Sequence, residues 1–466
     1  MSKKQNASKG SFLSFGGFGQ SYSSILKYFF PELITALILY SLPYFVDCYF
    51  IAHLKSTEIY TISGVVDNVL NLFVKIAEGL SIGTVAIAGY HNGLKQYKDV
   101  GKSFVDAFWV SVFIGAMISF LLYVGGYWVY KFFNFTESAI QIGLPFLKIR
   151  AISMFLMFIF FACVGFFRSI KNTFVPMVLF AIGSAVFVFF DYCLIFGKLG
   201  FPELGLQGSA VSYLLQYVVM LLCALVYIFG FSFHEKYKIN IMSGISSYSD
   251  VFRLLAISLP IVIDKAIMAW AYIWLSKVLS CMGQYALANF AVIKLMERMA
   301  FLPAVAFSQV VTFLVSNDAG NERWDDIRAN IAKVLLLASV MVAVLLCIGS
   351  LYPAKIIDLI DRNKEFGGLA QAVFPALSVL VFFDLLQLIL SGALRGACDV
   401  QTVMLTRLCV ICFYFVPVSY MLSRLSFSSD ALKFFLIYGS FFIGNALMSL
   451  VYIKKFAKKA VTVFKK

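Results

Sequence analysis

Residues 174–197 read FVPMVLFAIGSAVFVFFDYCLIFG, and Asp191 is the single charged residue in this stretch. A helix rises ~1.5 Å per residue, so the stretch is long enough to cross a hydrocarbon layer ~30 Å thick. Its apolar residues do not alternate with polar ones, which argues against a barrel strand and indicates a helix. The stretch therefore predicts a transmembrane helix that carries one acid.

Comparable apolar stretches recur along the whole chain of 466 residues, of which 61% are hydrophobic and 13% charged. One soluble core could not bury so much apolar surface, so lipid is the expected solvent. The predicted fold class is an all-α polytopic membrane protein with twelve transmembrane helices. The expected spans are 25–53, 62–91, 104–130, 141–167, 174–197, 207–230, 250–281, 285–316, 329–352, 367–394, 402–422 and 431–453.

The twelve spans divide into two six-helix bundles, at 25–230 and 250–455, joined by a cytosolic linker at 231–249. Residues 1–24 are polar and rich in Ser and Gly, and we expect a disordered cytosolic tail there. Residues 456–466 are expected to form a basic cytosolic tail.

The net charge of +14 is distributed by topology. Most lysines and arginines outside the spans fall in the tails and in the even-numbered connections, which predicts cytosolic termini in a plasma (cell inner) membrane. This distribution removes the reason to expect a nucleic-acid partner. The nine cysteines and three histidines show no metal-ligand spacing, so no cofactor is expected beyond a coupling ion.

An internal repeat relates the two halves by one constant offset along the chain. The superimposed pairs include Gly165 with Gly392, Arg168 with Arg395, Asn172 with Asp399, Ser81 with Ser308 and Asp99 with Asp326. Six spans per half bring each half back to the side from which it entered, so a pseudo-two-fold axis along the membrane normal is expected. Two like-oriented bundles that rock around a cavity favour a monomeric transporter over a channel.

Four aspartates inside predicted spans are candidates for cation coupling, because an intramembrane charge persists only with a partner or a wet cavity. Asp47 and Asp191 lie at matching depth in the first half, and could share a proton or bind one monovalent cation. Asp264 and Asp384 form a second pair at roughly matching depth. The alternative is structural: a Tyr, Ser or backbone group satisfies an Asp, or a lysine pairs with Asp264.

The remaining intramembrane charges have simpler interpretations. Lys75 with Glu78 and Lys294 with Glu297 are spaced i, i+3, which favours local ion pairs and leaves a cavity-lining role open. Lys148 and Arg150, near the outer end of the fourth span, are expected to extend toward the membrane interface.

Several segments together resemble the multidrug and toxic compound extrusion (MATE) family, within the wider multidrug/oligosaccharidyl-lipid/polysaccharide exporter superfamily. The resemblance covers roughly residues 25–455. It rests on FVDCYFIAHL (45–54), GLSIGT (79–84), HNGLKQYKDVG (91–101), RSIKNTFVP (168–176), FGKLGFPELGLQGSAVS (196–212), MERMAFLPAVAFSQ (296–309) and LSGALRGACD (390–399). The FPELGLQGSA segment and the two arginine repeats are the most specific parts.

The resemblance implies a twelve-helix exporter that moves organic cations outward against an inward flow of Na⁺ or H⁺. Asp47 and Asp191 occupy positions similar to the family's coupling acids of the first half, and Asp384 that of a second-half acid. A Na⁺ ion held by Asp47 and Asp191, or by Asp264 and Asp384, is therefore one expectation.

Three departures from the family pattern favour H⁺ over Na⁺. Phe187 stands where the family usually has an Asn that helps the cation site, and Tyr213, beside Ser212, replaces a Thr. Met268 stands where some members have a Glu, and Asp264 lies one turn earlier. A proton needs fewer oxygen ligands than a metal ion does. Tyr213 and Ser212 are expected to line the cavity.

These observations together predict a secondary active antiporter that exports organic cations or drugs in exchange for H⁺ or Na⁺. The alternative is a lipid or lipid-linked oligosaccharide flippase of the same superfamily, because intramembrane lysines and arginines could meet a phosphate. No arrangement of catalytic residues indicates an enzyme. The expected partners are a small organic substrate and the lipid bilayer.

Overall fold

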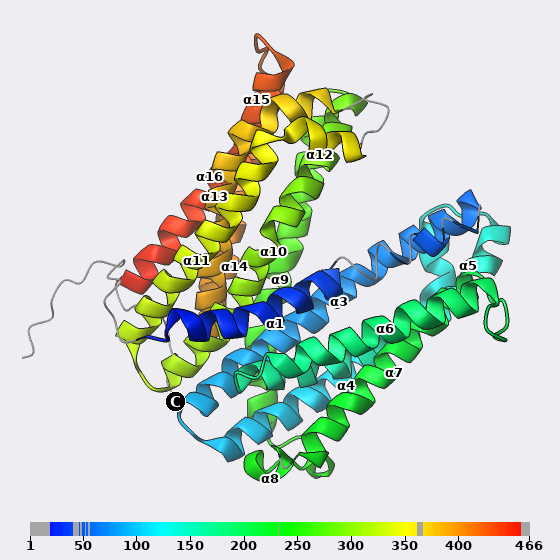
Figure 1. Ribbon diagram of the computed structural model, residues 1–466, viewed down its shortest axis with the longest axis vertical. Helices are drawn as coiled ribbons and strands as arrows, with labels where there is room; N and C mark the ends of the chain where they lie inside the picture. The colour runs from blue at the N-terminus through cyan, green and yellow to red at the C-terminus, as the bar shows by residue number, and fades with distance from the viewer. Residues whose placement is uncertain are drawn as a thin grey trace, which may run out of the picture. The chain divides into compact units, whose positions relative to one another are not determined.

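The computed structural model describes residues 19–40, 46, 49–51, 53–54, 56–231, 233–360 and 367–457. Asp47 and residues 1–18 and 458–466 of the expected tails lie outside the described residues. Among the described residues there is no strand, and twelve helices are long and apolar enough to cross a membrane. The predicted all-α class and the predicted number of spans are confirmed (Figure 1).

The helices before the middle of the chain begin with α1, and each carries much of one predicted span. Their bounds are α1 (Tyr22–Tyr40), α3 (Thr57–Gly93), α4 (Tyr97–Phe132), α5 (Glu137–Ser169), α6 (Phe174–Phe196) and α7 (Leu206–Gly230). The linker holds the short helices α8 (Phe233–Tyr237) and η1 (Ile241–Ser243).

The second set of helices begins with α9 and includes one short helix that the sequence pattern did not predict, α12. The bounds are α9 (Tyr248–Ser280), α10 (Gln284–Gly320), α11 (Trp324–Leu351), α12 (Pro353–Ile360), α13 (Gly368–Gly396), α14 (Val400–Val410), η2 (Ile411–Phe415), α15 (Val416–Arg424) and α16 (Asp430–Ala457). A π-helical turn, η2, joins α14 to α15, and the three make one span, Val400–Arg424.

Helix ends repeat at the offset found in the sequence. Thr57 and Gly93, which bound α3, correspond at that offset to Gln284 and Gly320, which bound α10. The same offset relates the first residues of α4 and α11 and the last residues of α5 and α13. The internal repeat is therefore a repeat of helices as well as of residues.

The chain forms two compact units, Tyr28–Ala266 and Met1–Lys27 with Ile267–Lys466. These differ from the expected bundles because α9 divides between them: Tyr248–Ala266 belongs to the first unit and Ile267–Ser280 to the second. Residues 19–27 also belong to the second unit, where the Gln20 amide donates to Asn330 Oδ1 at 2.7 Å.

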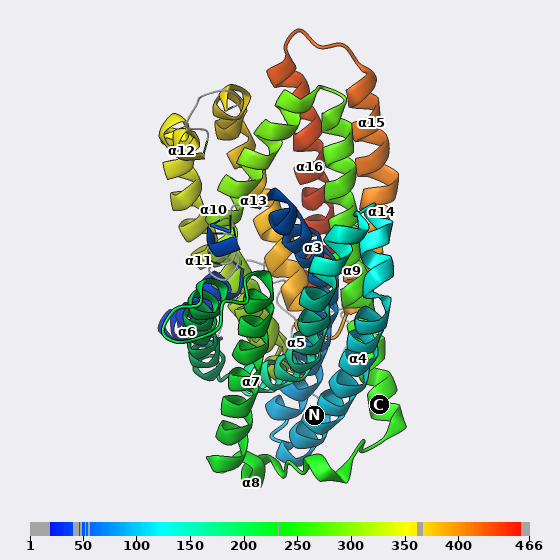
Figure 2. The same cartoon turned by 90° about the vertical axis from the view of Figure 1, so that its right-hand side faces the viewer.

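Within the first unit, α3 and α4 pack on α5, and α6 packs along α7 (Figure 2). Four aromatic side chains in the core of this unit are Phe104, Phe160, Phe166 and Phe167. Within the second unit, α10 packs on α11 and α13, and α13 packs on α16 (Figure 1).

Two glycines related by the repeat let helices approach closely. A Cβ on Gly165 would lie 2.8 Å from the backbone oxygen of Ser81, and one on Gly392 would lie 2.8 Å from that of Ser308. Real Cβ atoms do not come so near an oxygen. The same two residues therefore meet in each half, as the constant offset between the halves predicts.

The linker is anchored on the first unit through Tyr237, at the end of α8. Its ring packs edge-on against Phe166 at 5.5 Å and Tyr97 at 5.6 Å. A Cβ on Gly101 would lie 2.0 Å from the Tyr237 backbone oxygen, so α4 admits the linker only because glycine stands there. Burial raises the pKa of the Tyr237 phenol to about 12.

Candidate functional site

The first unit holds a buried arginine side chain, Arg150, between three helices. Arg150 of α5 donates to Asp67 Oδ1 of α3 at 2.5 Å, and its Cζ lies 3.5 Å from the ring centroid of Tyr213 on α7. Arg150 is only 7% exposed, so the expectation that it extends toward the membrane interface is wrong. Asp67 offsets part of the free-energy cost of burying this guanidinium, because a buried charge that is paired costs less than one that is not.

Asp191 lies on α6, one turn after Phe187, and is fully buried. The Phe187 ring contacts the Tyr213 ring, with 4.5 Å between centroids. Ser212 is also buried, and its hydroxyl donates to the Gly208 backbone oxygen of its own helix at 2.9 Å. Of the residues expected to line a cavity, Tyr213 thus contacts a charged group, while Ser212 has its proton committed within α7.

A second cluster of the first unit is centred on Glu78 of α3. Glu78 pairs with Lys75 at 3.1 Å, as the i, i+3 spacing predicts, and also with Lys265 of α9. Asp264, next to Lys265 in sequence, is 2% exposed. Adjacent helical residues point in different directions, so Lys265 reaches Glu78 while Asp264 is directed elsewhere.

The second unit holds a larger polar cluster. Lys294 of α10 pairs with Glu297 at 3.2 Å, again as the spacing predicts, and its Nζ lies 3.9 Å from the ring centroid of Tyr272 on α9. Tyr438 of α16 donates from its hydroxyl to Glu297 Oε2 at 2.6 Å. Glu297 is 6% exposed and Tyr438 fully buried, so this carboxylate is held away from solvent.

Asp384 of α13 completes this cluster. Asn445 of α16 donates from Nδ2 to Asp384 Oδ1 at 3.0 Å. The carboxylate is attracted by the charges of Lys294 and Arg407 and repelled by that of Glu297. The four charged groups are balanced, two against two, and Asp384 is the acid among them that is half-buried rather than buried.

The structure therefore assembles Asp384, Lys294 and Glu297, which the sequence analysis named separately. The first unit also holds Asp67, an intramembrane acid that was not among the four predicted from the sequence. Asp67 lies inside the predicted span 62–91, so the rule that selected the other intramembrane acids would have found it. Among the described residues, no group of three or more His, Cys, Asp or Glu side chains could hold a metal ion.

A sequence model of the family described as MatE matches residues 33–193 and 260–421, one segment in each half. The chain belongs to the MatE family. It is a multi-pass membrane protein of that family, as the resemblance in sequence implied.

Known proteins similar to this MatE chain agree with the assignment. A probable multidrug resistance protein NorM from Bacillus cereus is 22% identical over 419 residues, covering 87% of this chain and 89% of the relative. A MATE family transporter of the MOP superfamily, solved in an outward-facing conformation, superimposes with a TM-score of 0.84 at 16% identity, covering 98% and 99%.

A third neighbour, from Pyrococcus furiosus, is described as a MOP superfamily transporter whose reversed pocket polarity suggests a different function. It superimposes with a TM-score of 0.83 at 15% identity, covering 95% of this chain and 96% of that one. At such identities the likeness shows the MatE fold alone.

Two departures of this MatE chain from its family's pattern lie against each other. Phe187 and Tyr213, which stand where the resemblance implies an Asn and a Thr, are in ring contact, and Tyr213 presents its ring to Arg150. At these two positions a phenyl ring stands in place of the implied Asn amide, one turn before Asp191, and the implied Thr is replaced by a Tyr whose ring contacts Arg150. Arg150 and Tyr213 thus form a cation–π contact in the first unit.

Proposed function

We propose that this chain is a secondary antiporter that exports organic cations or drugs across the plasma (cell inner) membrane in exchange for H⁺, with both termini in the cytosol. Its MatE membership and the multidrug resistance relative support export of small molecules. The observation that carries the choice of H⁺ over Na⁺ is Phe187, one turn before Asp191, whose ring packs against Tyr213 and offers no oxygen to a metal ion where the resemblance implies an Asn.

The cluster around Asp384 supplies an exchange chemistry for this proposal. With the carboxylate ionised, Asp384 and Glu297 balance Lys294 and Arg407, and protonation leaves one net positive charge. Binding of a proton therefore weakens binding of an organic cation near this cluster, and binding of the organic cation weakens binding of the proton. Such competition is what an antiporter needs, since the two ligands must favour opposite conformations.

In the first half we assign coupling to Asp47 and Asp191, with alternating access by rocking of the bundles. Asp191 is fully buried, so a change in its protonation would act on a packed interior. Replacing Asp47 by Asn should then uncouple export from the gradient. Unchanged gradient-driven efflux in Asp47→Asn would remove that residue from the mechanism.

The test uses the purified protein in liposomes loaded with a fluorescent lipophilic cation such as ethidium. We expect efflux to follow an imposed pH gradient and not to respond to a Na⁺ gradient of the same size. The double variant Phe187→Asn with Tyr213→Thr restores the residue types that the resemblance implies, including an amide oxygen one turn before Asp191, and we expect it to gain a Na⁺ response. Equal driving by Na⁺ in the unmodified protein would overturn H⁺ coupling.

A lipid or lipid-linked oligosaccharide flippase is the second candidate, and the buried cations are its support. Arg150 and Lys294 both lie on tyrosine rings inside the bundles, where a phosphate could meet them. Each cation is already paired with a carboxylate, Asp67 or Glu297, which favours the export of cations. Movement of a fluorescent phospholipid between leaflets, without efflux of ethidium, would favour the flippase.

A further inference from the structure

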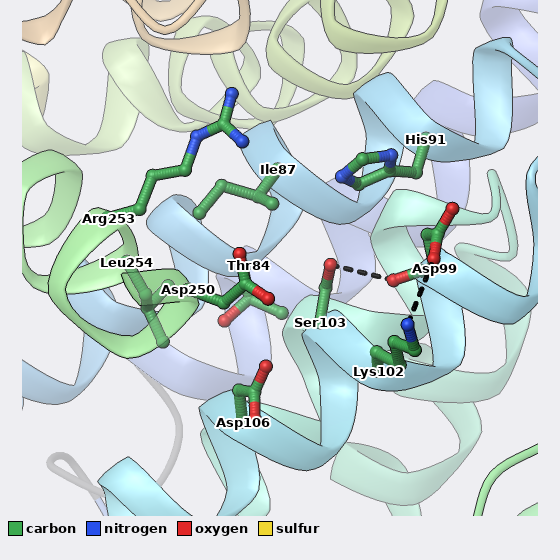
Figure 3. A pocket seen from close by; sticks show the side chains of 10 residues that line it. All are labelled: Thr84, Ile87, His91, Asp99, Lys102, Ser103, Asp106, Asp250, Arg253 and Leu254. Carbon is green, nitrogen blue, oxygen red and sulfur yellow. Dashed lines mark hydrogen bonds and ion pairs between the residues drawn. The ribbon is translucent and has the colours of Figure 1, made fainter. Parts of the chain in front are cut away.

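A cavity of about 130 Å³ lies within the first unit, and none of its lining residues belongs to the charged clusters described above. It is lined by residues of α3, α4 and the beginning of α9 (Figure 3). The charge pattern of the sequence predicts that this end of the helices faces the cytosol. Its polar lining includes the side chains of Thr84, Ser103, Asp106 and Asp250. Among the charged groups that line it are three carboxylates and two cations, so the cavity is acidic on balance.

Asp106 is the residue that makes this cavity a candidate site. It is 2% exposed, and its Oδ1 accepts a hydrogen bond from the Ser246 amide at 2.7 Å. Its Oδ2 is buried and has no hydrogen-bond partner among the residues that the structure describes. A buried carboxylate oxygen without a donor is costly, so the atom indicates a ligand that supplies one.

The hydroxyl groups of the cavity are available only as acceptors. Thr84 donates its proton to the Leu80 backbone oxygen at 2.9 Å, and Ser103 donates its own to the Asp99 backbone oxygen at 2.8 Å. Each hydroxyl therefore has lone pairs and no proton left for a ligand. This lining matches a cation that donates hydrogen bonds and does not match an anion.

The cationic side chains of the lining leave room for such a ligand. Lys102 pairs with Asp99 at 3.6 Å, and the guanidinium of Arg253 is directed away from Asp106 and Asp250 (Figure 3). Asp106 is repelled electrostatically by Asp250 and attracted by Lys102, and a bound cation would offset the repulsion between the two carboxylates. In Figure 3 the oxygens of Asp106, Asp250 and Ser103 surround the same space.

We propose that this cavity binds the N–H-bearing head group of an organic cation, an ammonium or guanidinium, on the cytosolic side before export. The direction of transport in this proposal rests on the proposed function, whereas the preference for a cation that donates hydrogen bonds rests on Asp106. A directly ligated metal ion fits less well, because no three carboxylate, imidazole or thiolate groups of the described residues converge to hold one. The site would hold the head group while the rest of the substrate extends past exposed Asp250.

Calorimetry on the purified full-length protein tests the proposal with methylguanidinium as the probe and tetramethylammonium, which has no N–H, as its control. We expect methylguanidinium to bind at least tenfold more tightly than tetramethylammonium, and Asp106→Asn to weaken that binding at least tenfold. Equal binding of the two cations, or undiminished binding by Asp106→Asn, would overturn the proposal.

Two further variants guard against a folding defect. Ser103→Ala leaves Asp106 in place and removes one acceptor, so we expect a several-fold loss of methylguanidinium binding with unchanged thermal stability. Asp325→Asn changes an acid of the second unit whose side chain is 87% exposed, and should bind like the unmodified protein. If Ser103→Ala binds methylguanidinium normally, the cavity is not the site.

Efflux from liposomes separates this proposal from the proposed function. If methylguanidinium binds at Asp106 but ethidium is not exported, the proposed cation site stands and the proposed export function is wrong. If Asp106→Asn exports ethidium with the same apparent KM as the unmodified protein, the proposed export function stands and the proposed cation site is wrong.

Discussion

Asp67 of α3 and Lys294 of α10 occupy the same position of the repeat, related by the offset that relates Gly165 to Gly392, and carry opposite charges. In the first unit the acid of this position binds Arg150 of α5, which lies on the ring of Tyr213. In the second unit the cation of this position lies on the ring of Tyr272 and pairs with Glu297. Each half thus places a cation on a tyrosine, from a different helix and with a different partner.

The two clusters differ in the number of carboxylates near the cation. Arg150 binds Asp67 from across the bundle, an arrangement suited to holding three helices together. Lys294 has Glu297 beside it and is attracted by the charge of Asp384 as well, so a carboxylate of this cluster can change its protonation without leaving Lys294 unpaired. We infer that the cluster of Asp67 and Arg150 is mainly structural and that, of these two clusters, the one around Asp384 exchanges ions.

Asp384→Asn should have the largest effect, because it fixes the second cluster in the charge state of the protonated acid. We expect ethidium efflux driven by a pH gradient to fall to the level of liposomes without protein. Fluorescence of ethidium in liposomes measures this. Asp325→Asn, an exposed acid of the same unit, is the matched control and should export at the normal rate. Normal efflux by Asp384→Asn would contradict the inference that this cluster exchanges ions.

Much of the fold could be predicted because lipid imposes a simple rule. A run of apolar residues such as 174–197 must form a helix if its backbone is to be satisfied, and α6 ends within one residue of that prediction. Other helices extend beyond the apolar run: α4 begins at Tyr97 and not at 104, because its first polar turns are helical but lie outside the hydrophobic pattern. The division of α9 between two units has no local signal in the sequence.

The site was harder to predict because it depends on which helices meet. Spacing alone was enough for Lys294 with Glu297, since i, i+3 neighbours share a helix face. Pairing of Arg150 with Asp67, across 83 positions of sequence, requires knowing that α3 packs on α5. Asp47 lies outside the described residues, so its assignment stays a prediction.

Asp67→Asn should destabilise the first unit without a comparable loss at the second. It leaves Arg150 buried beside Tyr213 without its carboxylate, at a cost of about 3 kcal/mol, the lower end for breaking a buried pair, because Asp67 keeps partial exposure. We expect a fall in the melting temperature of the purified protein. The double variant Asp67→Asn with Arg150→Met removes both charges and should recover much of that loss. A double variant no more stable than Asp67→Asn would show that the pair is not the cause.

Gly165→Ala and Gly392→Ala test whether the two halves are alike where their charges are not involved. A Cβ at either position would lie 2.8 Å from a serine backbone oxygen, so each substitution should cost about 1–3 kcal/mol by overpacking. Thermal denaturation of the two variants measures the comparison. Gly64→Ala is the control, since nothing lies within 4 Å of its Cβ and the helix should be stabilised. A large cost in only one half would mean that the repeat of packing is not energetically equivalent.

Tyr237→Phe should have the smallest effect, and it assigns pH dependence to the carboxylate clusters. Burial raises the pKa of Tyr237 from its ordinary value of 10 to about 12, so the neutral phenol favours the folded state. That contribution is complete below pH 10 and is lost as the pH rises from 10 to 12. Tyr237→Phe should therefore match the unmodified protein in stability and efflux between pH 5 and 9, and differ only above pH 10. If Tyr237→Phe alters the efflux profile at neutral pH, the linker that it anchors takes part in coupling, and the contrast between the two clusters is incomplete.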